Sequence, residues 1–288
     1  DSFAKTHGIP LAFPTYDAML DSDQIDAIYI PLPTSAHVEW TKKVLDAGKH
    51  VLCEKPIALE ASQIDQLIAA RNESGKVAAE AFMVTYHPQW LKVRDLIAQG
   101  AIGKLRHIQG SFTYFNRDPN NMRNKPELGG GGLLDIGVYP TVASRFVTGQ
   151  EPTRANASIE RDPEFGTDIF ANCHYQFDGF DMSFYCSTQL AARQSMVFHG
   201  DEGFIEVSAP FNAEIFDAVT VTLSNQGHNE SQSWSFNAAQ QYTLQVEAFG
   251  QKVAGEDVDL FTLENSKRNQ AAIDALFASG EQGGWVDV

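Results

Sequence analysis

A regular alternation of apolar and helical stretches in the first hundred residues restricts the possible folds more than any other feature. The apolar runs cover residues 27–33, 50–56 and 77–83, and the amphipathic stretches that suit helices cover 35–48, 62–75 and 87–100. Runs that are apolar throughout, without polar alternation, are typical of parallel strands buried on both faces. The pattern therefore predicts an α/β fold with a doubly wound parallel sheet.

The hydrophobic pattern changes after Gly103. Later stretches mostly alternate apolar and polar residues and are joined by short turns; they cover 105–115, 153–162, 168–177, 181–190, 195–210, 218–225 and 231–237. Such alternation indicates an antiparallel sheet with one covered face. Helical stretches at 242–255 and 263–280 end the chain. We therefore predict two domains, 1–84 and 85–288, bridged by the helix 87–100; the second is an α+β domain with a large, mostly antiparallel, open-faced sheet.

The charge balance is strongly acidic, because 21 Lys and Arg residues are set against 37 Asp and Glu residues, for a net charge of −16. A surface of this sign repels phosphate backbones and anionic lipids, so nucleic acid and membrane partners are not expected. The sequence also holds no apolar run that approaches the roughly 20 residues of a membrane-spanning helix.

The cysteines and histidines do not suggest a disulfide framework or a metal site. Cys53, Cys173 and Cys186 are too few and too scattered for a framework or a C-x-x-C pair, and the eight histidines form no H-x-x-x-H pair. We expect no metal ion, and a reducing cytoplasm is the compartment that fits best.

Two strand ends in the first domain carry unusual residues. The strand 27–33 runs into "PLPTSAH" (31–37), where two prolines stiffen the turn, and the strand 50–56 ends on Glu54, Lys55 and Pro56. Ligands of doubly wound sheets bind beyond the carboxyl ends of the strands. Both ends are therefore candidates for a ligand site, although a surface ion pair followed by a turn proline would also explain Glu54-Lys55-Pro56.

A run of glycines precedes another unusual helix. In "NKPELGGGGLLDIGVYPTVASRFVTG" (124–149), four glycines lead into a helix on which Asp135 and Tyr139 stand four residues apart, hence on one face. Gly137 between them costs about 1 kcal/mol relative to alanine, which indicates a close approach there. The run is not a G-x-G-x-x-G phosphate loop, because Asp135 takes the last position and a polar loop precedes it. The alternative is a flexible hinge before an ordinary core helix.

Together these segments resemble the Gfo/Idh/MocA-type oxidoreductase family, which includes glucose–fructose oxidoreductase, inositol dehydrogenase and dimeric dihydrodiol dehydrogenase. The matching features are "P-x-x-x-H" (Pro33, His37), "EKP" (54–56), "HPQ" (87–89), "GGG-x-L-x-D-x-G-x-Y" (130–139) and "YTLQ" (242–245). Tyr139, where the inositol dehydrogenases have His, points to the glucose–fructose oxidoreductase and dihydrodiol dehydrogenase branch. Thr34 is a departure, since many members have Asn in that turn.

The resemblance implies hydride transfer between NAD or NADP and a CH–OH group of a sugar, a sugar derivative or a diol. It implies Lys55, Asp135 and Tyr139 as the catalytic set, with Lys55 and Tyr139 as the acid–base pair. The implied cofactor contacts are Pro31, Leu32, Pro33, Thr34, His37, Glu54 and Lys55, and the implied substrate contacts are His87, Asn121, Arg123, Asp135, Tyr139 and Tyr242. A cis peptide bond between Lys55 and Pro56 is implied as well. The alternative within the family is a non-catalytic regulator that binds dinucleotide and sugar.

The charge of Lys55 could change the acidity of Tyr139. An unperturbed tyrosine has a pKa near 10 and is a poor base at neutral pH. A lysine ammonium about 4 Å away would stabilise the phenolate by roughly 4 kcal/mol at an effective dielectric constant of 20. We therefore expect Lys55 to lower the pKa of Tyr139.

The start of the chain, "DSFAKTHGIP", resembles the tail of the helix that follows the second strand of a dinucleotide-binding domain. The first βαβ unit, of roughly 30 residues, would then be missing together with its phosphate-binding turn. We therefore expect an N-terminally truncated, incomplete Rossmann domain, and weak cofactor binding by this chain alone.

We expect the open face of the second-domain sheet to pair with a second copy of the chain as a homodimer. Strand residues assigned to this face are Phe184, Tyr185, Phe204 and Trp234. An exposed apolar patch of that size usually marks an interface.

Overall fold

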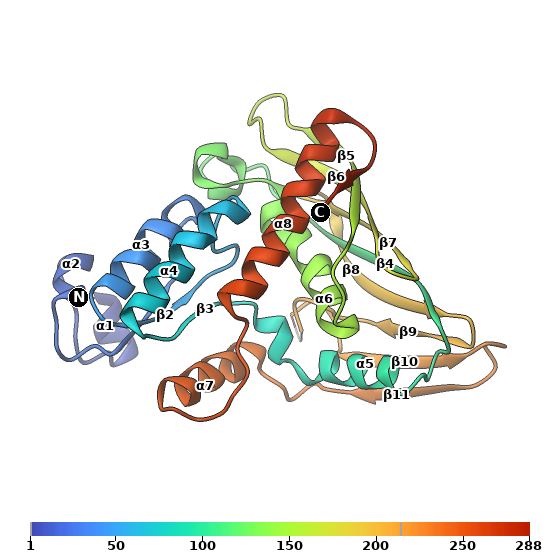
Figure 1. Ribbon diagram of the computed structural model, residues 1–288, viewed down its shortest axis with the longest axis horizontal. Helices are drawn as coiled ribbons and strands as arrows, with labels where there is room; N and C mark the ends of the chain where they lie inside the picture. The colour runs from blue at the N-terminus through green and yellow to red at the C-terminus, as the bar shows by residue number, and fades with distance from the viewer. Residues whose placement is uncertain (1, 214) are drawn as a thin grey trace.

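A parallel sheet of three strands forms the core of the N-terminal part in the computed structural model, which describes residues 2–213 and 215–288. The elements follow the chain in the order α1 (Ser2–His7), α2 (Tyr16–Leu20), β1 (Ala27–Ile30), α3 (Thr34–Asp46), β2 (His50–Cys53), α4 (Ile64–Ser74) and β3 (Ala78–Glu80). Val51 pairs with Ile28 on one side and with Ala78 on the other, so β2 is the central strand. Figure 1 shows α3 and α4 side by side next to this sheet.

Both faces of β2 and β3 are covered, which explains why these strands carry buried residues in succession, whereas Ala27 and Tyr29 of β1 are exposed. Ile30 and Val51 lie in one cluster with residues of α3 and α4, such as Val44 and Leu67. Leu52 and Ala79 point the other way and pack with Phe249 of α7 (Gln241–Val253). Because successive strand residues face opposite sides of a sheet, covering both sides requires apolar residues in succession.

Within the described residues, a second sheet of nine strands follows, in the spatial order β11-β10-β9-β8-β4-β7-β6-β5-β12. Its strands are β4 (Leu105–Phe115), β5 (Arg154–Arg161), β6 (Asp168–Gln176), β7 (Asp181–Ser187), β8 (Gln189–Gly200), β9 (Gly203–Val207), β10 (Thr220–Asn225), β11 (Ser231–Ser235) and β12 (Val286–Asp287). The pair β4–β7 is parallel and the other neighbours are antiparallel. The predicted fold class, a parallel α/β sheet followed by a large, mostly antiparallel one, is confirmed.

Helices cover one face of the large sheet. They are α5 (Pro88–Ala98), α6 (Val138–Thr148) and α8 (Leu263–Gln282), and Figure 1 shows α8 and α6 in front of the strands. Strand residues on this face, such as Ile108, Met182 and Phe198, are fully buried. The opposite face carries polar residues such as Gln109 and Glu206, which are exposed.

The assignment of four aromatic residues to the open face is wrong for two of them. Phe184 is 2% exposed and lies in the core beneath the helices, because it alternates with Tyr185 along β7. Trp234 packs against the core near α5, with the Lys92 ammonium 4.0 Å from its ring centroid. Tyr185 and Phe204 remain on the less buried positions of their strands.

The helix α8 joins the two sheets. Its Glu264 forms an ion pair of 2.7 Å with Arg71 of α4, and its Gln270 donates a hydrogen bond of 3.0 Å to the Leu59 carbonyl. The other end of α8 packs on β5. The predicted domain boundary at residue 84 falls in a short 3₁₀ helix, Met83–Tyr86, between β3 and α5.

None of the described helices combines the length and the apolar character that crossing a lipid bilayer requires. Among residues 2–213 and 215–288, no group of three or more His, Cys, Asp or Glu side chains is arranged to hold a metal ion.

Candidate active site

The turns after β1 and β2 are tied together by His37. Its ring nitrogens lie 2.7 Å from the Leu32 carbonyl oxygen and 2.8 Å from the Pro56 carbonyl oxygen. His37 is buried, and burial lowers the pKa of its imidazole although both carbonyl groups oppose this shift. The peptide bond between Lys55 and Pro56 is cis, as expected. The two strand ends therefore form one rigid edge, from which Lys55 projects.

The glycine run enters a π-helical turn, Leu133–Gly137, that continues into α6. A Cβ on Gly137 would lie 2.9 Å from Leu133 and 3.4 Å from the Cys186 sulfur, so the missing side chain lets this turn sit closely on β7. Gly131 has φ of 126°, and a Cβ there would overlap the carboxylate of Asp168. The glycines thus serve close packing of the backbone, and the turn presents Asp135 on the side of Lys55.

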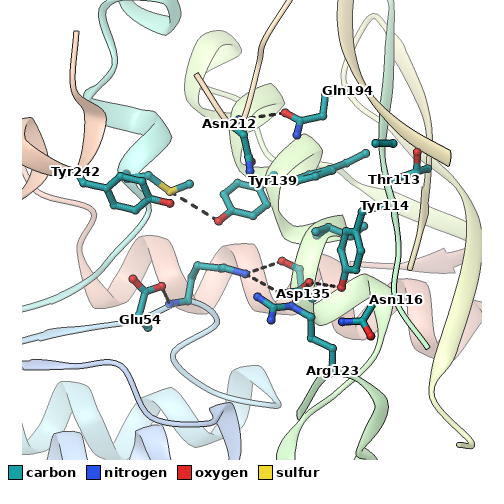
Figure 2. Close-up of a pocket in the computed structure, with 15 residues that line it drawn as sticks. Glu54, Thr113, Tyr114, Asn116, Arg123, Asp135, Tyr139, Gln194, Asn212 and Tyr242 are labelled. Carbon is teal, nitrogen blue, oxygen red and sulfur yellow. Dashed lines mark hydrogen bonds and ion pairs between the residues drawn. The ribbon is translucent and has the colours of Figure 1, made fainter. Parts of the chain in front are cut away.

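Three side chains converge on the Asp135 carboxylate (Figure 2). The Lys55 ammonium donates to the Asp135 carbonyl at 2.6 Å and to Oδ1 at 3.2 Å. The Tyr114 hydroxyl and the Arg123 Nε donate to Oδ2 at 2.7 and 2.8 Å. Lys55, Arg123 and Asp135 come from three separate segments, so the fold brings the sequence-predicted Lys55 and Asp135 together.

The partners of Asp135 decide its ionisation. Burial raises the pKa of this carboxyl, but the charges of Lys55 and Arg123 and the hydrogen bonds from Tyr114 and Arg123 outweigh burial, so the pKa lies below its ordinary value. Charge-assisted hydrogen bonds of this kind are among the strongest in proteins. Asp135 is therefore a carboxylate at neutral pH, with its oxygens committed to the protein.

Tyr139 lies in a different environment. Its side chain is 6% exposed, and the rings of Phe112 and Phe211 are each 5.6 Å from its own, between centroids. Its hydroxyl is 3.7 Å from the Met83 sulfur, and the Lys55 ammonium lies 5.0 Å above the ring centroid. The Tyr139 hydroxyl and the Lys55 ammonium therefore have different hydrogen-bond partners, the Met83 sulfur and Asp135.

The expectation that Lys55 lowers the pKa of Tyr139 is wrong. Burial raises the pKa of this phenol well above its ordinary value, and the negative charges of Glu54 and Asp135 and the Tyr242 phenol act in the same direction. The Lys55 ammonium is hydrogen-bonded to Asp135 and faces the ring instead of the hydroxyl. Tyr139 is consequently a protonated phenol at neutral pH.

Two cavities meet at these residues. The first, of about 490 Å³, is lined by Lys55, Asp135, Tyr139, Arg123, Glu54 and Tyr242, and by Met83, Phe112, Thr113, Tyr114, Asn116, Ile136, Ala192, Gln194 and Asn212. The second, of about 290 Å³, lies beyond the carboxyl ends of β1 and β2. Glu54, Lys55, Arg123 and Asp135 line both cavities, so these four residues mark the junction.

The second cavity gathers most of the residues predicted to contact the cofactor. Pro31, Leu32, Thr34, His37, Glu54 and Lys55 line it. Pro33 does not; it occupies the N-cap position of α3, where its ring starts the helix. Tyr29, Met122 and Gly129 were not predicted and also line it. Tyr29 donates a short hydrogen bond to Glu54, which holds the Glu54 carboxylate beside Lys55.

The predicted substrate contacts divide into two groups. Arg123, Asp135, Tyr139 and Tyr242 line the first cavity. His87 and Asn121 do not. His87 is buried and accepts a hydrogen bond from the Gln89 amide as the N-cap of α5, and Asn121 caps a short helix by accepting from the Arg123 amide at 3.0 Å. Both are therefore engaged in local structure.

Sequence reasoning missed Tyr114 and Phe112, which line the same cavity from β4. Both belong to the strand face that points toward α6, and strand alternation alone could have placed them there. That pattern does not reveal that the cavity interrupts the core at this end of the strand. The first cavity is also lined by Asn116, Gln194 and Asn212, which belong to no sequence motif that could have identified them.

Two family models match the chain. The model described as "Oxidoreductase family, NAD-binding Rossmann fold" matches residues 1–82, and the "GFO/IDH/MocA C-terminal domain" model matches residues 90–206. The gap between the two matches coincides with the passage from the small sheet to the large one.

Several curated proteins are similar along most of the chain. An uncharacterised oxidoreductase of Rhizobium meliloti is 37% identical over 99% of this chain and 86% of its own. The dTDP-3,4-didehydro-2,6-dideoxy-alpha-D-glucose 3-reductase of Actinomadura kijaniata is 30% identical over 91% of this chain and 78% of its own. The trans-1,2-dihydrobenzene-1,2-diol dehydrogenase of Xenopus laevis is 32% identical over 72% of this chain and 62% of its own.

Solved structures share the fold. A 3-ketoreductase from Actinomadura kijaniata, in complex with NADP and TDP-benzene, superimposes with a TM-score of 0.89 at 28% identity and covers 96% of this chain and 85% of its own. An aldose–aldose oxidoreductase from Caulobacter crescentus gives the same TM-score at 22% identity, over 100% of this chain and 88% of its own.

Proposed function

Because this chain belongs to the GFO/IDH/MocA family of oxidoreductases, whose N-terminal domain is an NAD-binding Rossmann fold, we propose that it transfers a hydride between NAD or NADP and the CH–OH carbon of a sugar, a sugar derivative or a diol. The observation that carries this proposal is that Lys55 and Asp135 lie where the two cavities join, with Tyr139 in the first cavity and its ring centroid 5.0 Å from the Lys55 ammonium. Hydride transfer needs this arrangement, since both reactants must approach the same few atoms.

The second cavity is the place for the nicotinamide half of the cofactor. It lies beyond the carboxyl ends of parallel strands, where doubly wound sheets hold their ligands. Pro31 and Leu32 supply an apolar wall, and Glu54 and Thr34 supply polar groups beside it. The bound nicotinamide provides the chemistry of hydride exchange, which protein side chains do not have.

The three site residues take different roles in this proposal. Asp135, ionised and fully hydrogen-bonded, fixes the Lys55 ammonium at the junction. Lys55 then faces the oxygen of the reacting carbon as a donor and stabilises negative charge there. Tyr139, protonated because of its burial, gives a proton to that oxygen when a carbonyl is reduced. A raised phenol pKa keeps this proton on Tyr139 at neutral pH until the transfer, and in the oxidation direction the same phenol oxygen takes the proton back.

The relatives support these roles and the substrate class. The reductase and the diol dehydrogenase named above act on a sugar nucleotide and on a diol, as their names state. Solved structures of the Actinomadura kijaniata 3-ketoreductase include a lysine-to-alanine and a tyrosine-to-phenylalanine variant. The two substituted positions are separated in that chain by the same number of residues as Lys55 and Tyr139 here.

The test is a turnover assay of the purified protein. Absorbance of the reduced nicotinamide is followed with each cofactor and a panel of D-glucose, D-xylose, trans-1,2-cyclohexanediol and the matching lactones and ketones. Because weak cofactor binding is expected of this chain alone, the cofactors are used at high concentration; we then expect turnover with at least one pair, and its loss in Lys55→Ala. Cofactor binding without turnover on any member would instead favour the non-catalytic regulator.

We further propose that the open face of the large sheet pairs with a second copy of the chain. Tyr185 and Phe204 on that face are only partly covered, and such aromatic residues favour an interface. Light scattering at micromolar concentration should give about twice the 31.7 kDa of one chain. A particle of 31.7 kDa would contradict the homodimer.

We also propose a cytoplasmic location. Cys53, Cys173 and Cys186 are all free and buried, and unpaired thiols suit a reducing compartment. Fractionation of cells that express the tagged protein would test this; recovery outside the cytoplasm would contradict it.

A further inference from the structure

Two buried carboxylates, one in each part of the molecule, hold the backbone next to the site residues. Glu80 is the last residue of β3, and Asp168 is the first residue of β6. Each is 2% exposed, and neither lines the two cavities described above. Both side chains are acidic and yet lie in the protein interior, next to the site and outside its cavities.

Glu80 holds the turn that carries Lys55. The Ile57 amide donates to its Oε1 at 2.9 Å, and Ile57 lies two residues after Lys55. Strand pairing of β2 ends at Cys53, so this amide must find its acceptor outside the sheet. The neighbouring Pro56 carbonyl is 2.8 Å from His37 Nδ1. Two consecutive backbone groups of this turn, the Pro56 carbonyl and the Ile57 amide, are thus held by His37 and Glu80 respectively.

Asp168 holds the turn that carries Asp135. The Leu133 amide donates to its Oδ2 at 2.6 Å, and Leu133 lies two residues before Asp135. The first N–H groups of a helical turn have no acceptor within the helix, and a carboxylate at that end also suits the helix dipole. Gly131 leaves the space that the Asp168 carboxylate occupies. The geometry therefore mirrors that at Glu80.

Neither carboxylate is paired with a cation. None of the ion pairs among the described residues includes Glu80 or Asp168. Burial accordingly raises the pKa of Glu80 to about 7, although the Ser266 side chain and the Ile57 amide oppose the shift. Burial also raises the pKa of Asp168 to about 6, although the Leu133 amide and the charge of Arg161 oppose the shift. Burying an acidic side chain without a counter-ion costs free energy. The hydrogen bond that each side chain accepts from the backbone offsets part of this cost.

We propose that Glu80 and Asp168 are the positioning residues of the site: Glu80 sets the direction of Lys55, and Asp168 sets that of Asp135 and Tyr139. This inference rests on the proposed function, in which the Lys55 ammonium must meet the Asp135 carboxylate at the junction of the cavities. What positions each turn is an acceptor oxygen within hydrogen-bond distance of the backbone amide. The negative charge of the carboxylate matters less for this role.

A pair of Glu80 variants separates reach from charge. Glu80→Gln keeps an oxygen at the same distance and removes the charge, whereas Glu80→Asp keeps the charge and withdraws the oxygen by one methylene. We expect kcat within about threefold of the wild type for Glu80→Gln and at least tenfold lower for Glu80→Asp, with KM for cofactor and substrate nearly unchanged. The substrate is the one with the highest rate in the panel above.

Asp168 is tested in the same way. Asp168→Asn retains an oxygen acceptor and should keep most of kcat, and Asp168→Ala should lose at least tenfold. The matched control is Asp274→Ala. Asp274 is partly buried and, like Asp168, accepts a hydrogen bond from a backbone amide, that of Ala61 at 2.8 Å, but it lines neither cavity. The control should leave kcat unchanged.

A second measurement does not need turnover. Amide hydrogen exchange is followed at Ile57 and Leu133: it should accelerate at least tenfold at Ile57 in Glu80→Asp and at Leu133 in Asp168→Ala, and stay near wild type in Glu80→Gln and Asp168→Asn. Unchanged exchange, or a kcat lost in Glu80→Gln and kept in Glu80→Asp, would overturn the inference. If no member of the panel is turned over, the proposed function fails, and the exchange data still decide whether the two carboxylates hold these turns.

Discussion

The first cavity has two walls, and each contains a buried acidic group whose pKa is shifted in the opposite direction from the other. On the polar wall, formed by Lys55, Tyr114, Arg123 and Asp135, the buried carboxyl has a lowered pKa because two cations and a hydroxyl surround it. On the aromatic wall, formed by Met83, Phe112 and Tyr139, the buried phenol has a raised pKa because burial outweighs the opposing charge of Arg123.

This difference teaches how one cavity can hold a fixed charge and a proton donor side by side. Equal burial would raise the pKa of both acids, so the difference comes from their partners. Groups whose environments push their pKa values apart are the ones that divide acid and base roles in enzymes. Lys55 belongs to the polar wall by its hydrogen bonds and touches the aromatic wall only through the Tyr139 ring.

The largest effect should come from removing one reacting group from each wall. Tyr139→Phe and Lys55→Ala should each lower turnover by at least ~100-fold, about 2.7 kcal/mol of barrier, the usual scale for acid–base groups. The double variant should lose far less than the product of the two, since both groups act on one oxygen. Tyr175→Phe is the control, because that buried hydroxyl bonds to the Ala272 carbonyl away from the cavity. Near-wild-type turnover in Tyr139→Phe would remove Tyr139 as the proton donor.

Tyr114→Phe should have the next largest effect, because it takes one donor from the polar wall and leaves the shape of the cavity intact. A lost hydrogen bond to a charged group costs roughly 1.5 kcal/mol, or about tenfold in turnover. Tyr185→Phe makes the same change on the open face of the large sheet and should leave the kinetics unaltered. Equal kinetics for both variants would mean that Tyr114 does not help to hold Asp135.

A smaller effect is expected on stability when the polar wall loses a charge. Asp135 has a folded pKa below its ordinary value of 3.8, so its contribution to stability is present above that value and is lost as the pH falls through the folded pKa. Arg123→Gln moves the folded pKa upward, so the contribution of Asp135 to stability becomes smaller and its loss is complete at a higher pH.

We expect roughly 1 kcal/mol less stability at neutral pH in Arg123→Gln, after allowance for the partial exposure of this side chain. Urea unfolding at neutral and acidic pH measures the difference. Arg106→Gln, which breaks the exposed pair with Asp201, should behave as the wild type. An Arg123→Gln variant with unchanged acid unfolding would show that Lys55 and Tyr114 suffice to hold Asp135.

The sequence predicts the scaffold better than the chemistry of its walls, for physical reasons. Continuous and alternating apolar patterns locate the strands, and the motifs bring Lys55 and Asp135 to one place. The direction of the Tyr139 shift depends on burial and on where the Lys55 ammonium bonds, and neither follows from residue type. Tyr114 looks like any inward residue of β4. Phe184 and Tyr185 are neighbours in one strand, so their side chains must point to opposite faces of the sheet. Strand alternation alone therefore shows that they cannot both lie on the open face.

The smallest effect should come from a residue at the rim of the first cavity, where the side chain is in contact with water and belongs to neither wall. Tyr242 lines the first cavity at the start of α7 and is half exposed. Water can replace what its hydroxyl offers to a substrate, so Tyr242→Phe should raise KM by no more than about threefold, or roughly 0.6 kcal/mol, and leave kcat unchanged. Steady-state kinetics on the best substrate of the panel measure both values. A fall in kcat comparable to that of Tyr139→Phe would instead mean that the phenol of Tyr242 reaches the reacting oxygen, and that the rim takes part in the chemistry we assign to the aromatic wall.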